Sequence, residues 1–198
     1  MDFNFNSSIQ QIKLNLLNVH NEVQKRRLND HQITCIPGCS HCCNRLISVL
    51  TSEALIIYES IKKHELWNSI HEKLKEQSEI IKKINGNQLS WYYTNTPCAL
   101  LSDNKCIVYP VRPVMCSVHH VISNPKSCHS FTISDDYRPL DYNDIYNRFL
   151  EKSINSVADY GILNLRLPLQ TALLFAEKIQ IQSNLTFEKL ISLYLNEV

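Results

Sequence analysis

The sequence predicts a mainly α-helical protein, in which helices at both ends pack against an irregular, loop-rich cysteine-cluster metal centre. Apolar side chains recur at three- and four-residue steps before residue 87 and after residue 140, which is the spacing of one helix face. Only three residues are glycine, which leaves little room for tight hairpins. Residues 87–140 show few helical periods but contain four of the eight cysteines. We expect a single domain over residues 1–198, with an N-terminal helix (1–34), a metal-binding core (35–130) and C-terminal helices (131–198).

The first helix is expected to begin at Ser7 or Ser8, because a serine hydroxyl can accept from the unpaired N–H groups of a first turn. The polar residues 29–31 end it. Its buried face is a single apolar stripe made of Ile9, Ile12, Leu16, Val19 and Val23.

A short extended segment is expected at residues 46–50, after the first cysteines. Thr51 or Ser52 then starts a second helix, with Glu53 in its positively polarised first turn. One long helix or two broken helices continue to Gly86, which can adopt the left-handed conformation that ends a helix. The expected buried positions are Ala54, Ile57, Ile61, Leu66, Ile70, Leu74, Ile81 and Ile84.

Helical periodicity returns after residue 140. Pro168 suits the first turn of a helix, where its missing N–H has no partner to lose, and Thr186 is expected to cap a last short helix. The inward positions are Ile145, Phe149, Ile154 and Val157, then Ala172, Leu173, Phe175 and Ala176, then Leu190, Ile191 and residues 193–195.

Charge and hydropathy argue against two classes of partner. The 20 basic and 19 acidic residues leave a net charge of +1, so no nucleic-acid partner is expected. No apolar run reaches the roughly 18 residues of a membrane-spanning helix, so no membrane partner is expected. The start, MDFNFNSSIQ, lacks the basic and apolar regions of a secretory signal. We therefore expect a cytoplasmic location.

Eight cysteines are many for a reducing compartment, where clustered thiols favour metal or redox chemistry over stable disulfides. Cys35, Cys39, Cys42 and Cys43 lie within nine residues. Gaps of two or three residues allow one turn to aim several sulfurs at the same ion. The side chains of adjacent Cys42 and Cys43 diverge unless the backbone bends, so they can serve different metals or different irons of one cluster.

The other four cysteines, Cys98, Cys106, Cys116 and Cys128, are too far apart for one local turn. They can close only in three dimensions, for example against the first set. Two four-thiolate sites and one cluster with spare ligands both fit, and zinc and iron–sulfur clusters both accept all-thiolate ligation. Two further interpretations stay open, namely small buried core residues and a redox dithiol at Cys39 and Cys42.

Three blocks between residues 35 and 128, about half the chain, form a joint pattern. They are Cys35-x-x-Gly38-Cys39-Ser40-His41-Cys42-Cys43 with Val49-x-x-Ser52-Glu53-Ala54, then Cys98-x-Leu100-Leu101 with Cys106-Ile107-Val108-Tyr109-Pro110, then Arg112-Pro113-x-x-Cys116 with Cys128 beyond. This pattern resembles the YkgJ-type CxxCxxCC family of zinc- or iron-chelating cysteine-cluster proteins. One departure is the gap of three residues between Cys35 and Cys39, where the family's name has two.

The resemblance implies that these cysteines chelate metal, with an iron–sulfur cluster or Zn²⁺ as the cofactor and a metal ion as the partner. It implies no single reaction. A similar cysteine cluster in flagellin lysine N-methylases implies a methylase-like enzyme, although this chain has no glycine-rich nucleotide loop. A redox enzyme, a structural zinc adaptor module, and a protein that stores, senses or delivers metal are equally compatible with clustered thiols.

Several side chains near the thiols are secondary candidates. His41, His119, His120 and His129 can each act as a ligand or an acid–base group, but eight thiols suffice for two tetrahedral sites, which favours ordinary polar roles. Arg112 can offset the negative charge of several thiolates or pair with a surface carboxylate.

Overall fold

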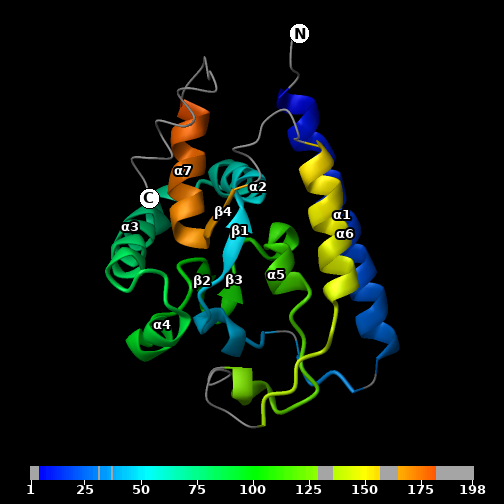
Figure 1. Cartoon of the computed structure of the whole chain (residues 1–198). Coiled ribbons are helices and arrows are strands. Elements are labelled where there is room, and N and C mark those ends of the chain that lie inside the picture. Colours follow the sequence, from blue (N-terminus) through cyan, green and yellow to red (C-terminus); the bar gives the residue numbers. More distant parts are fainter. Residues whose placement is uncertain (1–4, 31, 37, 129–135, 157–164, 182–198) are drawn as a thin grey trace.

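The protein is described by a computed structural model that covers residues 5–30, 32–36, 38–128, 136–156 and 165–181 (Figure 1). The fold is mainly α-helical, as predicted. The α-helices are α1 (Phe5–Asn29), α2 (Thr51–Lys63), α3 (Trp67–Lys83), α4 (Gln88–Thr94), α5 (Val114–Ser117), α6 (Asn143–Ser156) and α7 (Leu169–Ile181). The strands are β1 (Ser48–Leu50), β2 (Leu101–Ser102), β3 (Lys105–Cys106) and β4 (Arg166–Pro168), and the 3₁₀ helices are η1 (His41–Asn44), η2 (Tyr109–Val111) and η3 (Pro125–Cys128).

Two sets of helices enclose the core. In Figure 1, α1 and α6 lie side by side and run in opposite directions, and they contact each other along their length. Helix α7 packs on α2 and α3 on the other side of the molecule, and α1 contacts α2. The antiparallel pair β1–β4 lies between these sets, together with α5. The cysteine-bearing turns gather at one end of this framework.

The first helix confirms the predicted apolar stripe. Its five members are at most 7% exposed, so they anchor α1 to the core. The predicted start is wrong by a few residues, because α1 begins at Phe5 and Ser7 and Ser8 lie inside the helix. Helix ends are loosely determined by sequence, since the first four N–H groups have no partner within the helix.

The second and third helices confirm the predicted order of elements. Helix α2 begins at Thr51 directly after β1, and the chain breaks before α3, where Glu65 has a φ of 56°. Gly86 has a φ of +65° and donates its N–H to the Ile81 carbonyl at 2.9 Å, which is the expected left-handed termination. The predicted positions Ala54, Ile57, Ile61, Ile70, Leu74 and Ile81 are buried, and Leu66 and Ile84 are half-buried.

Helix α4 lies inside the segment that was predicted to be irregular. Asn87 caps it by accepting the Ser90 N–H at 2.8 Å, and Asn95 ends it with a φ of 52°. Its one buried residue is Trp91, which is 1% exposed. A helix of seven residues with a single buried side chain has no apolar repeat for a sequence pattern to detect.

Two further predictions are wrong at single residues. Pro168 ends strand β4 opposite Ser48, and α7 begins one residue later, at Leu169. The Leu169 N–H donates to the Ile47 carbonyl at 3.0 Å, so the strand pairing continues up to the start of the helix. Ile154 in α6 is 43% exposed rather than buried.

The remaining C-terminal predictions are confirmed where the structure describes them. The inward residues Ile145, Phe149, Ala172, Leu173, Phe175 and Ala176 are at most 1% exposed. Val157 and the helix expected after Thr186 lie outside the described residues. Within the described ranges, no helix is both long enough and apolar enough to cross a membrane.

Candidate metal centre

The first four cysteines lie in a tight turn that leads into η1. Gly38 has a φ of +86°, and this left-handed residue directs the chain into the turn. The Cys43 N–H donates to the Ser40 carbonyl at 2.9 Å, and the Arg45 N–H donates to the Cys42 carbonyl at 3.2 Å. A 3₁₀ helix has about three residues per turn, so neighbouring side chains point roughly 120° apart. Cys42 and Cys43 therefore leave the turn at different angles, and their thiols still lie close enough to interact through a hydrogen bond.

The second set of cysteines reaches the first set through the backbone. The Cys98 N–H donates to the Cys43 carbonyl at 2.7 Å. The chain then forms the β2–β3 hairpin, in which Leu101 pairs with Cys106. Its two turn residues, Asp103 and Asn104, have φ values of 49° and 58°, so this tight hairpin forms without glycine. The hairpin sets Cys106 beside the loop that carries Cys98.

Cys116 lies in α5, and a buried carboxylate ties this helix to α2. Glu53 is 3% exposed and accepts two backbone N–H groups, one from Leu50 and one from Val114, each at 2.9 Å. Burial raises the pKa of Glu53, while these two bonds act in the opposite direction. The sequence predicts Glu53 in the first turn of this helix but reveals neither of the two contacts.

Cys35 and Cys128 lie in loops that are bonded to each other. Thr34 donates its N–H to the Val121 carbonyl at 3.1 Å, and its hydroxyl donates to the carbonyls of Val121 and Ser123. The Val121 N–H in turn donates to the Cys35 sulfur. Cys128 ends η3, which packs against η1.

Charge interactions between the thiols fall into two overlapping sets that share Cys42. Burial raises the pKa of Cys116 well above its usual value, with further increases from Cys42, Cys98 and Cys106. Burial likewise raises the pKa of Cys128 to about 12, with further increases from Cys42, Cys35 and Cys39. We call Cys43, Cys98, Cys106 and Cys116 the inner group, and Cys35, Cys39, Cys42 and Cys128 the outer group.

The two groups meet at Cys42 and Cys43. A hydrogen bond between their side chains lowers the pKa of Cys42 and raises that of Cys43. Cys42 also raises the pKa values of Cys98, Cys106 and Cys116 in the inner group. It therefore lies close enough to influence both groups.

Several sulfurs accept backbone hydrogen bonds. The Leu100 N–H donates to Cys98 and the Val108 N–H donates to Cys106, and each bond acts to lower the pKa of its thiol. The Arg112 guanidinium also acts to lower the pKa values of Cys106 and Cys116, which agrees with its expected charge-offsetting role. Such interactions favour the thiolate form that a metal requires.

All eight cysteines are free thiols, seven of them half-buried and Cys128 buried. In the part of the chain that the structure describes, no three His, Cys, Asp or Glu side chains are already arranged to hold an ion. The donor chemistry nevertheless fits zinc or iron, because the site offers several thiols and a compensating cation.

A family comparison bears directly on these thiols. Residues 34–137 match the CxxCxxCC family model, which is described as "Putative zinc- or iron-chelating domain". The chain belongs to the CxxCxxCC family. The matched segment begins next to Cys35 and contains all eight cysteines. No curated protein and no solved structure matches the chain. Metal binding, with zinc or iron as the cofactor, is therefore the function class of this CxxCxxCC protein.

The histidines of the CxxCxxCC region differ in their surroundings. Burial and the charge of Arg45 lower the pKa of His119 to about 3, and burial with Arg27 and Arg112 lowers that of His120 to about 4. Both rings are therefore neutral at physiological pH. Arg45 Nη1 lies 2.8 Å from Nδ1 of His119 and donates to the Tyr137 hydroxyl at 3.2 Å. His41 lies in η1, and His129 falls outside the described residues.

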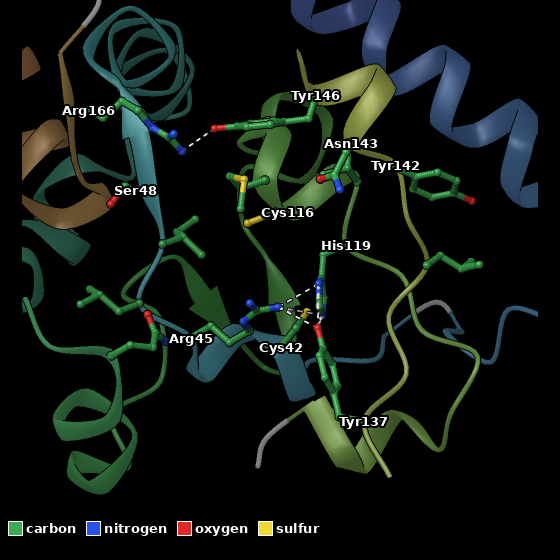
Figure 2. Close-up of a pocket in the computed structure, with 16 residues that line it drawn as sticks. Cys42, Arg45, Ser48, Cys116, His119, Tyr137, Tyr142, Asn143, Tyr146 and Arg166 are labelled. Carbon is green, nitrogen blue, oxygen red and sulfur yellow. Dashed lines mark hydrogen bonds between the residues drawn. The ribbon is translucent and has the colours of Figure 1, made fainter. Parts of the chain in front are cut away.

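A cavity of about 500 Å³ opens beside the thiols, and the sequence patterns did not indicate it. Cys42 and Cys116 contribute one sulfur from each group to its wall (Figure 2). Arg45, His119 and Tyr137 cluster at one end in this view. The opposite end is formed by residues 146 and 166, which lie beyond the CxxCxxCC match.

Proposed function

We propose that this protein holds zinc or iron through all eight cysteines, in two four-thiol sites that divide at the Cys42–Cys43 peptide bond. The observation that carries the proposal is the hydrogen bond from the Cys98 N–H to the Cys43 carbonyl, because it brings the sequence-distant thiols to the first cluster. The inner group then provides one ligand set and the outer group the other.

The donor chemistry restricts the metal. Thiolates are soft ligands that select zinc and iron–sulfur clusters, whereas calcium and magnesium require oxygen ligands. Four thiolates around one divalent ion leave a net negative charge, and Arg112 supports the proposal because its positive charge acts on Cys42, Cys106 and Cys116. When bound, the metal ties the loops together or exchanges electrons, according to its identity.

A reducing compartment such as the cytoplasm suits this function. The eight cysteines are free thiols, and thiols must stay reduced to act as metal ligands. The net charge of +1 supports the further expectation that the protein has no nucleic-acid partner.

Anaerobic purification followed by metal analysis and absorption spectroscopy tests the proposal. A colourless protein with two zinc ions per chain, or a coloured protein with iron and sulfide, agrees with it. Cys39→Ser and Cys98→Ser each remove one ligand from a different group, and each is expected to lower the metal content. Ser40→Ala in the same turn is the matched control and should retain full metal content. A Cys98→Ser protein with wild-type metal content contradicts the two-group arrangement.

A metal-dependent enzyme is the second candidate, and the cavity favours it. Catalytic metal sites keep an open position, whereas structural zinc sites are closed by four protein ligands. The sulfurs of Cys42 and Cys116 border the cavity, so a small molecule there reaches the centre. Replacing the metal with cobalt(II) and adding azide distinguishes the two cases. A shift of the cobalt absorption bands indicates an open position, and an unchanged spectrum indicates a closed structural site.

A further inference from the structure

The cavity beside the thiols has the size and the wall of a small-molecule site. Its volume of about 500 Å³ lies within the roughly 300–1,000 Å³ range of ligand pockets. Its wall includes the apolar side chains of Met115, Val118 and Leu140. Polar side chains lie at both ends, as Figure 2 shows. This arrangement suits a molecule with an apolar body and a polar head.

The charge of the wall defines the head group. Two arginines, Arg45 and Arg166, line the cavity, and none of the described lining residues is an aspartate or glutamate. A buried carboxylate, that of Glu53, does interact with Arg166, which acts to lower its pKa. Both oxygens of Glu53 accept backbone N–H groups outside the cavity wall. Away from the thiols, the cavity wall therefore presents positive charge at its two arginines.

The Arg166 end is built by two elements that pack on the core. Strand β4 pairs Arg166 with Leu50 of β1, which sets the position of its backbone. The guanidinium donates to the Tyr146 hydroxyl of α6, and its carbon lies 5.5 Å from the centre of the Tyr146 ring. In Figure 2 this pair lies at the upper edge of the cavity, above Cys116 in the view. A guanidinium has five N–H donors in a planar fork, so one held against tyrosine can still bind an oxyanion through two parallel hydrogen bonds.

We infer that this cavity binds a small organic anion, a carboxylate or a phosphate ester with a short apolar body, and that the Arg166–Tyr146 pair holds the anionic head. The apolar body lies along Met115 and Val118, which brings it to the Cys42 and Cys116 sulfurs. Tyr146 and Arg166 lie outside residues 34–137, so the residues that select the anion are not part of the matched CxxCxxCC segment. The inference goes beyond the proposed metal centre and does not require it, because no metal ligand takes part in the head-group site.

Three probes of equal chain length test the inference on the full-length protein with its metal as purified. Hexanoate has a carboxylate head, hexyl phosphate has a phosphate head, and hexanamide has the same shape as hexanoate without the charge. Saturation-transfer NMR and titration calorimetry measure their binding. We expect one or both anions to bind and hexanamide to bind at least roughly tenfold more weakly, since a hydrogen bond to a charged group contributes more than one between neutral groups. Whichever anion binds more tightly identifies the head group.

Two arginine variants locate the site. Arg166→Gln is expected to weaken binding of the preferred anion by roughly ten- to a hundredfold, because the charged fork is lost. Arg166→Lys keeps the charge but not the fork, so it should recover only part of the affinity. Arg148→Gln is the matched control. Arg148 lies on the same helix as Tyr146, is 49% exposed and pairs with Glu22, and its variant makes the same change in net charge.

Two results would overturn the inference. One is equal binding of hexanoate, hexyl phosphate and hexanamide, or binding of none of them, which removes the case for an anion site. The other is a folded Arg166→Gln protein with the wild-type affinity for the anion. If Arg166→Gln fails to fold, the comparison of the three probes on the wild-type protein still decides the question. Loss of metal from the wild-type protein during purification would count against the proposed metal centre, and the same probes would test the anion site on that preparation.

Discussion

The inner and outer thiol groups are attached to the molecule in different ways. Two inner cysteines, Cys98 and Cys106, pack against the hydrophobic core. The loop before Cys98 is tied to α3, because Gln77 Nε2 donates to the Pro97 carbonyl at 2.8 Å. Of the outer cysteines, Cys35 lies in a loop that is joined to the Val121 loop through Thr34 and to α1 through Arg27. Cys128 is buried in η3 but is not part of the main hydrophobic core cluster.

This difference predicts which thiols are in position before metal binds and which are positioned by the metal. A ligand that is held by a packed core keeps its position without metal, whereas a ligand on a loop depends on the metal for its position. We therefore expect the inner group to resemble a prepared site. The outer group should gain most of its order from binding.

Removing the metal should have the largest effect and should separate the two groups. Structural zinc contributes about 10–16 kcal/mol of apparent binding free energy in small zinc-dependent domains. After treatment with a strong chelator, we expect amide protection to fall first in residues 38–44 and 120–128, and later or not at all in residues 98–108. Hydrogen exchange read by mass spectrometry measures this order. Equal loss of protection in both regions would show that the groups are equally dependent on metal.

Replacing one cysteine in each group should give unequal losses of stability. Cys106→Ser puts a hydroxyl against the core as well as removing a proposed ligand, and burying such a group without a partner costs about 1–3 kcal/mol. Cys39→Ser removes a proposed ligand without that contact with the core. Chemical denaturation of both proteins, each with its metal content determined, measures the difference in unfolding free energy. A larger loss for Cys39→Ser would reverse the comparison.

Glu53→Gln should affect the support of the inner group and change its pH dependence. The glutamine side chain has one amide oxygen, which can accept from the Leu50 N–H or from the Val114 N–H. The remaining N–H then faces the amide NH₂ group, which is also a donor, and the lost hydrogen bond costs about 1–3 kcal/mol.

The sign of the pH effect follows from the raised pKa of Glu53. Because burial raises it, the carboxyl's contribution is fully present below its unfolded pKa and is lost as the pH rises through the folded pKa. The charged and titratable groups that interact with it are Arg166 and Tyr146. Wild-type stability should therefore decline across this window by at most about 1.4 kcal/mol per pH unit from this group, and Glu53→Gln should lack that decline. Denaturation midpoints measured from pH 4 upward test it, and parallel curves for the two proteins would exclude the effect.

Thr34→Val should have the smallest effect and should act on the outer group. Valine keeps the shape of threonine but loses the hydroxyl that donates to Val121 and Ser123, which contributes about 1 kcal/mol. We expect faster metal loss from the outer site and little change in the inner one. Thr94→Val removes a hydroxyl bond within α4 and is the control. Equal metal-release kinetics for the two variants would argue against a role for Thr34.

The helices could be predicted from the sequence wherever they bury a long apolar stripe. Five regularly spaced residues identify α1, and the turn at Gly86 identifies the end of α3. Helix α4 and strand β4 could not be predicted in this way, because each is short and depends on distant partners. Trp91 Nε1, for example, donates to the carbonyl of Asn44, 47 positions earlier in the chain, and no local pattern records that bond.

The candidate site was predictable in its composition but not in its arrangement. All eight cysteines could be named from their spacing and family pattern, and their role as ligands stays a prediction. The approach of the distant cysteines to the first cluster depends on the hydrogen bond from the Cys98 N–H to the Cys43 carbonyl, which joins residues 55 positions apart. The cavity and its Arg166–Tyr146 pair left no signal, because a single arginine and a single tyrosine on different elements form no repeat or motif.

The peptide bond between Cys42 and Cys43 has a consequence for how the protein responds to metal supply. If each residue serves a different site, the first ion to bind orders the backbone from which the second site takes a ligand. The affinity of each site then depends on the occupancy of the other, and thermodynamic linkage makes this dependence equal in both directions. Metal in the inner site would therefore tighten binding at the outer site, whose loops have the most order to gain.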